Sequence, residues 1–186
     1  MNRIGWLVLA LCVTAGCSRY DVIPDRIEKQ VNREVTFDQI KQSPSTHQGQ
    51  LVVMGGQVLS ATRREDKTSL EVLQLPLTDD LMPANERAKS TGRFVAIDHG
   101  KEVGMAGLDP AVVKEGVPVT VVGEVVGQTT VKIGEAEQEV PKLRIVDLTV
   151  WDKDRWERDN AYYSGYGYGP GYGYWGAYPY RYGYYY

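Results

Sequence analysis

The sequence is poor in the residue types from which metal sites and covalent cross-links are built. Among its 186 residues it has only two cysteines and two histidines. His47 and His99 both fall in expected turns, without a recognisable spacing of zinc ligands, so we predict no metal and no cofactor. Cys12 lies in a segment that we expect to be removed, which leaves Cys17 without a partner for an intrachain disulfide. The folded part must therefore be stable without a cross-link, although exported proteins often contain one.

Neither sign of charge dominates, and no catalytic motif stands out. The 21 basic and 24 acidic side chains give a net charge of −3, which provides no electrostatic footprint for nucleic acid. The paired glycines Gly55 and Gly56 lack the lysine and the following helix of a phosphate-binding loop. Glu135, Glu137 and Glu139 alternate and could supply the carboxylate pair of a glycosidase, but an exposed acidic strand face is the favoured interpretation. We therefore predict that the chain is not an enzyme.

The chain also lacks an apolar run long enough to cross a bilayer. The N-terminal run from Ile4 to Val13 has ten residues, whereas a membrane-spanning helix needs about 20. A polar, basic start, a short apolar segment and small residues ahead of Cys17 are typical of a secretory signal. We interpret residues 1–16 as a signal peptide that is removed by cleavage.

Cys17 resembles the cysteine of a bacterial lipobox, whose thiol is acylated and which becomes the first residue after cleavage. Thr14 departs from this pattern, because bacterial lipoboxes usually carry leucine there. A mature lipoprotein of this kind carries three acyl chains such as palmitate, and more than one chain gives stable membrane attachment. Ser18, rather than aspartate, resembles the signal for outer-membrane sorting in Gram-negative bacteria. The alternative is a secreted protein in which Cys17 is a chance thiol.

Residues 17–34 are predicted to form a lipidated tether between the anchor and a folded domain. Val22-Ile23-Pro24 begins as an extended segment, and Ile27 and Val31 lie four residues apart, as on one face of a short helix. We expect these few apolar residues to lie on the domain. An interfacial helix on the membrane is the alternative, but its apolar face would be sparse.

Residues 35–152 carry the patterns of a small all-β domain. Apolar, β-branched runs predict five or six strands, at residues 51–59, 69–75, 92–97, 117–127, 129–133 and 140–150. Thr36 and Gln39 have the spacing of a capping box and predict a short helix that ends at Ser43-Pro44, and Asp109 predicts a further helical turn. Mid-strand glycines, at residues 55–56 and at 123, predict bulges or bends.

Short strands with mid-strand bends, in a chain without a long helix, favour a small antiparallel Greek-key barrel of the oligonucleotide/oligosaccharide-binding (OB) type. A sandwich of two sheets is the alternative. Barrels of this type bind ligands on one face, but the fold alone does not identify a ligand.

The C-terminal residues 153–186 have a different composition. Twelve of the 13 tyrosines lie from Tyr162 onward, in a glycine-rich segment without an aliphatic set that could form a core. This composition predicts a disordered extension. Its rings could stack on sugars of cell-wall or lipopolysaccharide glycans, lie at a membrane interface or associate with one another. The candidate contact residues are Tyr166, Tyr168, Tyr172, Tyr174 and Trp175.

Six segments of the chain carry a family resemblance through their content and their order. They are VIP (22–24), FDQI (37–40), GQLVVMGG (49–56), LEVLQLPL (70–77), GRF (92–94) and VTVVGEV (119–125). Together they resemble the Slp family of starvation-inducible outer-membrane lipoproteins, whose members often have tyrosine where this chain has His47. The shared part runs to about Trp151, which places the tyrosine-rich tail outside it.

The resemblance implies an outer-membrane lipoprotein with a structural role in stress or stationary phase, and it carries over no catalytic residue. The expected partners are membrane lipid, through acylated Cys17, and cell-wall or lipopolysaccharide glycans or other envelope proteins. The alternative is an oligosaccharide- or small-ligand-binding module at the cell envelope.

Overall fold

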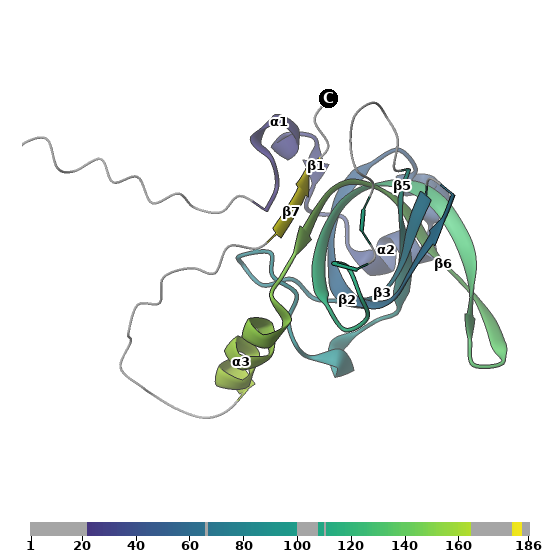
Figure 1. Ribbon diagram of the computed structural model, residues 1–186. Helices are drawn as coiled ribbons and strands as arrows, with labels where there is room; N and C mark the ends of the chain where they lie inside the picture. The colour runs from purple at the N-terminus through teal and green to yellow at the C-terminus, as the bar shows by residue number, and fades with distance from the viewer. Residues whose placement is uncertain (1–21, 66, 100–107, 110, 165–179, 184–186) are drawn as a thin grey trace, which may run out of the picture.

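A computed structural model describes residues 22–65, 67–99, 108–109, 111–164 and 180–183 of the chain. Its centre is a closed barrel of five strands (Figure 1). They are β2 (Leu51–Arg64), β3 (Lys67–Leu75), β4 (Arg93–Asp98), β5 (Pro118–Ile133) and β6 (Ala136–Val150). Around the barrel the order is β2-β3-β4-β6-β5, and β5 pairs back to β2. The predicted OB-like Greek-key barrel is therefore confirmed, and the two-sheet sandwich is wrong.

One strand pairing of the barrel differs from the antiparallel arrangement that the sequence predicts. β4 and β6 pair in parallel over three residues of each strand, at residues 95–97 and 142–144. The reason lies in the connections. The chain crosses from β4 to β5 without a hairpin, and β6 returns antiparallel to β5. This return gives β6 the direction of β4, and the short parallel pairing closes the barrel.

The glycines of the strands have two different roles. At Gly123 the β5–β6 register shifts, as the sequence predicts, and a second shift follows between Val125 and Gly127. β5 continues through both shifts to Ile133 as one strand, where the sequence predicts two strands. Gly56 shows no bulge, because the β2–β3 register is continuous there and shifts only between Val58 and Ser60. A Cβ at Gly56 would overlap the Leu73 carbonyl oxygen, so glycine permits close approach of β3.

The short helices form where local sequence signals place them. α2 (Phe37–Gln42) begins at Thr36, whose Oγ1 accepts from the Gln39 backbone N–H at 3.3 Å, while the Gln39 side chain accepts from the Thr36 N–H at 2.8 Å. The predicted capping box is therefore confirmed. A 3₁₀ turn, η1 (Pro44–His47), follows. Asp109 Oδ1 accepts from the Ala111 N–H at 2.8 Å, and the Asp109 carbonyl accepts from the Val113 N–H at 3.2 Å. These bonds form a single turn where the sequence predicts one turn of helix.

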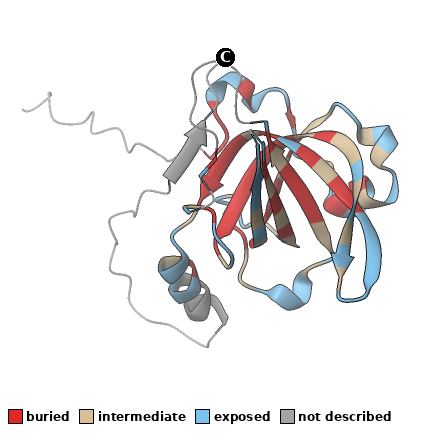
Figure 2. Cartoon of the chain, turned by 45° about the vertical axis from the view of Figure 1, so that its right-hand side comes forward, coloured by how far each residue is buried: buried red, intermediate tan, exposed pale blue. Residues whose placement is uncertain are grey.

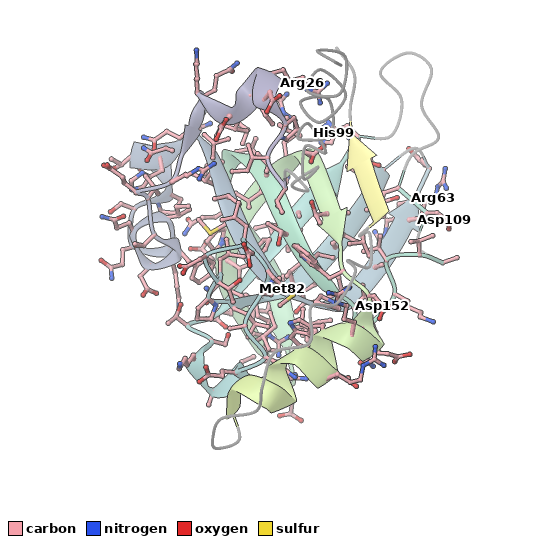
Figure 3. All side chains as sticks on the ribbon, turned by 90° about the vertical axis from the view of Figure 1, so that its left-hand side faces the viewer. Arg26, Arg63, Met82, His99, Asp109 and Asp152 are labelled. Atoms are coloured by element: carbon pink, nitrogen blue, oxygen red, sulfur yellow. The ribbon has the colours of Figure 1, made fainter. Side chains whose placement is uncertain are left out.

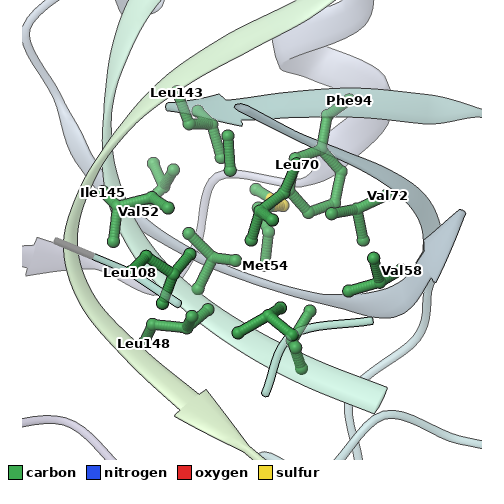
Figure 4. Close-up of a cluster of buried hydrophobic side chains, with 14 of the residues drawn as sticks. Val52, Met54, Val58, Leu70, Val72, Phe94, Leu108, Leu143, Ile145 and Leu148 are labelled. Atoms are coloured by element: carbon green, nitrogen blue, oxygen red, sulfur yellow. The ribbon is translucent and has the colours of Figure 1, made fainter. Parts of the chain in front are cut away.

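The apolar core fills the barrel, and other parts of the chain cover it near both ends of β4. The buried side chains labelled in Figure 4 come from β2, β3, β4 and β6, and from Leu108 in the segment after β4. Near the start of β4, Phe37 of α2 packs on Phe94 with ring centroids 6.3 Å apart. Near its end, Asp98 Oδ2 accepts from the N–H of the buried Leu108 at 2.7 Å, and Thr68 Oγ1 donates to the Leu108 carbonyl. Figure 2 shows buried residues along the strands and exposed residues at the tip of the β5–β6 hairpin.

The remaining elements lie on the outside of the barrel. They are α1 (Asp25–Glu28), β1 (Val31–Asn32), the 3₁₀ turn η2 (Arg87–Lys89), α3 (Lys153–Ser164) and β7 (Tyr180–Gly183). β1 pairs with β2 in parallel, and β7 pairs with β6 antiparallel. In Figures 1 and 3, α1 lies at the top and α3 at the bottom of the molecule.

The sequence does not predict α3 or β7. Asp152 begins α3, since its Oδ1 accepts from the Arg155 N–H at 2.8 Å. Among the side chains described in this helix, residues 153–158, the buried one is Trp156, which is 1% exposed and donates its Nε1–H to the Pro83 carbonyl. The sequence predicts a disordered extension over this part of the chain. Within it the structure describes α3 and β7, and residues 165–179 and 184–186 lie outside the described residues.

Candidate functional surface beside the tether

The residues that the sequence singles out for function lie outside the described part of the chain. They are the lipidation and sorting residues Cys17 and Ser18, and the ring residues Tyr166, Tyr168, Tyr172, Tyr174 and Trp175. The structure does describe the segment that follows the predicted anchor, from Val22 onward. It also describes the strand β7, which follows the tyrosine-rich segment and lies beside β6.

The tether packs on the outer wall of the barrel with its few apolar side chains. Ile23, Ile27 and Val31 form one buried cluster with Val122 of β5. Successive residues of a strand point to opposite faces, so Val122 faces outward while Val121 belongs to the interior core. This packing confirms that the apolar residues of the tether lie on the domain. Ile27 is buried, which removes the apolar face that the alternative, an interfacial helix, would require.

Side-chain burial contributes most of the free energy that holds the tether on the barrel. Fully burying an aliphatic side chain contributes about 1.5–3 kcal/mol, and Val22 and Ile23 are 5% and 4% exposed. Backbone pairing adds to it, because Val31 lies opposite Leu51 in the β1–β2 register. The chain is thus fixed to the barrel from Ile23 onward, one residue after the first described residue.

The loop between β3 and β4 joins the tether, the barrel and α3. Leu81 packs against the tether cluster and has a φ of +60°, which is uncommon for leucine. Its carbonyl accepts from Thr120 Oγ1 at 2.6 Å, and this hydroxyl in turn accepts from Trp151 Nε1 at 3.0 Å. Two residues further on, Pro83 accepts the indole N–H of Trp156. One loop therefore braces both the tether and α3 against the barrel.

A cleft of about 380 Å³ opens between the tether and the barrel wall. Its polar lining includes Arg26 and Gln30 from the tether and the ion pair of Arg144 with Glu124. The two members of this pair lie directly opposite each other in the β5–β6 register. The apolar lining is Ile27, Leu51 and Val146, and Gly49 completes the wall. Figure 3 shows Arg26 on α1 at the top of the molecule. The sequence does not predict this cleft.

The outer face of β3 and β4 corresponds to the face on which OB barrels usually bind ligands. Here it carries the ion pair of Arg93 with Glu71 at 2.7 Å, beside Leu73, Val95 and Ile97. Within the described part of these two strands the only aromatic residue is Phe94, and it points into the core. The described face therefore offers one ion pair and aliphatic groups, and no ring on which a sugar or base could stack.

The other candidate residues of the sequence are dispersed. His47 Nδ1 lies 3.4 Å from Gln50 Oε1, and His99 follows the end of β4. Glu137 and Glu139 are exposed near the tip of the β5–β6 hairpin, where Glu137 lies opposite Lys132. Among the described residues, no three histidine, cysteine or acidic side chains are grouped so that they could hold a metal. No helix in this part of the chain is long and apolar enough to span a membrane.

Comparison with known proteins gives one family. The family model described as "Outer membrane lipoprotein Slp family" matches residues 14–186. The match begins at Thr14, ahead of Cys17, and extends through the tyrosine-rich tail. The expectation that the shared part stops near Trp151 is therefore wrong, and the tail lies within the family's matched region. No curated protein matches the chain.

Proposed function

We propose, because the chain belongs to the Slp family of outer membrane lipoproteins, that it is anchored to the outer membrane through acyl chains on Cys17. In this proposal residues 1–16 are removed, Ser18 directs sorting, and the barrel lies on the periplasmic face. Its role is structural and without catalysis, in stress or stationary phase as the resemblance to starvation-inducible members implies. Its partners are membrane lipid and glycans or proteins of the envelope.

The observation that carries this proposal is the early docking of the tether. Only residues 18–22 separate Cys17 from Ile23, which is already buried on the barrel. Six extended residues span at most about 22 Å. An acylated Cys17 would therefore keep the barrel wall close to the lipid headgroups, with α1 and the cleft on the membrane side.

The arrangement of charged groups supports a structural role. The acidic groups Glu71 and Glu124 are engaged by arginines on neighbouring strands, and Glu137 and Glu139 face solvent on the hairpin. Catalytic acids and bases typically lie together in a cleft and have perturbed pKa values. Among the described residues that line the cleft beside the tether there is one carboxylate, Glu124, and it is paired with Arg144.

The experiment is the substitution Cys17→Ser, with Cys12→Ser as the matched control. We expect Cys17→Ser to abolish incorporation of labelled palmitate and to leave the protein in the soluble fraction after a high-salt wash, while Cys12→Ser remains acylated and membrane-bound. If the Cys17→Ser protein still incorporates palmitate, or still fractionates with outer membranes after the high-salt wash, the lipid anchor is wrong.

A second candidate function is glycan binding by the tyrosine-rich tail. It is favoured by β7, since pairing with β6 returns the end of the tail to the barrel and keeps residues 165–179 between two attached elements. Replacing Tyr166, Tyr168, Tyr172 and Tyr174 by serine leaves β7 intact and removes rings that could stack on sugars. We expect weaker binding to purified envelope glycans. Unchanged binding would exclude this function.

A further inference from the structure

We infer that the cleft between α1 and the barrel wall binds the phosphate of a phospholipid headgroup in the leaflet to which the protein is anchored. The site consists of Arg26 and Arg144 above the apolar residues Ile27, Leu51 and Val146. Nothing in the family description assigns a ligand to this region. The inference rests on the proposed function, because anchoring through Cys17 is what brings the cleft to the membrane.

The cleft has the size and the mixed lining that such a headgroup requires. Its volume of about 380 Å³ lies within the range of small-ligand sites. Guanidinium groups match the geometry of phosphate oxygens and bind them through several N–H donors. The aliphatic floor suits the glycerol and the first methylenes of a lipid, which a free inorganic phosphate lacks.

The ion pair of Arg144 with Glu124 positions one of the two arginines without exhausting its donors. The pair is made through Nη2 of Arg144, and a guanidinium carries five N–H groups. Arg144 and Glu124 lie opposite each other on paired strands, so the guanidinium is held at the cleft. Two guanidinium groups line the described part of the cleft, and a guanidinium binds an anionic ligand in preference to a cationic one.

The second arginine is fixed by the tether itself. Arg26 precedes the buried Ile27 in α1, so docking of the tether places its side chain at the rim of the cleft. Arg26 follows Cys17 by nine residues, and the chain is already docked on the barrel at Ile23. The cleft therefore lies beside the point at which the anchor would enter the membrane.

Vesicle binding by residues 17–186 carrying Cys17→Ser, which have no acylation site, tests this inference. The vesicles contain phosphatidylglycerol, or only phosphatidylcholine as the neutral reference. We expect co-sedimentation with phosphatidylglycerol vesicles at low salt, and amide shifts on binding at Gly49, Leu51 and Val146. Arg26→Gln and Arg144→Gln should each weaken binding about fivefold, the typical effect of one basic residue at an anionic surface. Glu124→Gln should strengthen it by a similar factor.

The matched controls are Arg63→Gln and Arg64→Gln, which remove the same charge at the far end of β2 from Leu51. They should leave binding unchanged. Equal losses for all four arginine variants would show a diffuse charge effect and overturn the site. Binding of soluble glycerol phosphate at the cleft without vesicle binding would overturn the lipid assignment. Because the assay contains no anchor, its failure differs from failure of the Cys17 proposal, which fractionation tests separately.

Discussion

The two ends of the described chain are attached to the same barrel by different forces. The tether is held by aliphatic burial, with Ile23, Ile27 and Val31 in one cluster on the outer wall. β7 is held through backbone pairing with Asp147–Val150. Aliphatic burial contributes about 1.5–3 kcal/mol for each side chain, whereas a net backbone hydrogen bond contributes about 0.5–1.5 kcal/mol. We therefore expect the anchor side of the molecule to be firmly docked and β7 to be readily displaced.

α3 is attached in a third way. Among its described side chains, a single large one, Trp156, is buried. Trp156 combines burial with an indole hydrogen bond to Pro83, on the same loop that braces the tether through Leu81. The tether is thus held by a cluster, α3 by a single anchor and β7 by pairing at a strand edge. Each can be weakened separately.

The largest effect is expected at the single anchor. Trp156→Ala should lower the free energy of unfolding by about 3–5 kcal/mol, because it leaves a cavity and removes the hydrogen bond to Pro83. Trp156→Phe keeps most of the ring and should cost much less. Denaturant titration measures both values. Equal losses for the two variants would mean that the hydrogen bond, rather than burial, holds α3.

A smaller effect is expected in the tether cluster. Ile27→Ala should lower the free energy of unfolding by about 2–4 kcal/mol and expose the tether to proteases ahead of the barrel. Lys29→Ala, two residues later and exposed, is the control and should change stability by less than about 0.5 kcal/mol. A tether that remains protease-resistant in the Ile27→Ala protein would contradict docking by side-chain burial.

The smallest effect is expected at β7. The double substitution Arg181→Pro and Tyr182→Pro removes two successive backbone N–H groups, one of which faces β6 in an antiparallel pair. Global stability should fall by no more than about 1 kcal/mol, while amide exchange of Asp147–Val150 accelerates. Arg181→Ala and Tyr182→Ala together are the control and should retain the protection. Unchanged exchange in the proline variant would show that β7 does not cover this edge.

The sequence predicts best those features that depend on nearby residues. The Thr36–Gln39 capping box is a contact over three residues, and the strand patterns need only alternation along the chain. The sequence predicts a bulge or bend at Gly55 and Gly56, but the role of Gly56 depends on the close approach of Leu73, which is a tertiary contact. α3 has a cap signal at Asp152 and little else, because its single apolar anchor gives no helical period. The parallel β4–β6 pairing follows from topology, which local pattern does not specify.

The candidate surface was only partly predictable for the same reason. The spacing of Ile27 and Val31 indicated a face that packs on the domain, and this is confirmed. The cleft brings Arg26 together with Arg144, which comes from the other half of the chain, and each alone resembles an ordinary surface charge. A basic residue directly before the buried tether position was the one available signal.

The most direct measurement is energy transfer from the barrel to labelled lipid headgroups. In the proposed mature protein, acylation blocks Cys17 and cleavage removes Cys12, so an introduced cysteine would be its only reactive thiol. Donor dyes at Lys29→Cys on the tether and at Arg64→Cys at the far end of β2 are compared in vesicles. We predict strong transfer from position 29 and much weaker transfer from position 64. Equal transfer, or stronger transfer from position 64, would contradict a barrel held to the membrane by its docked tether.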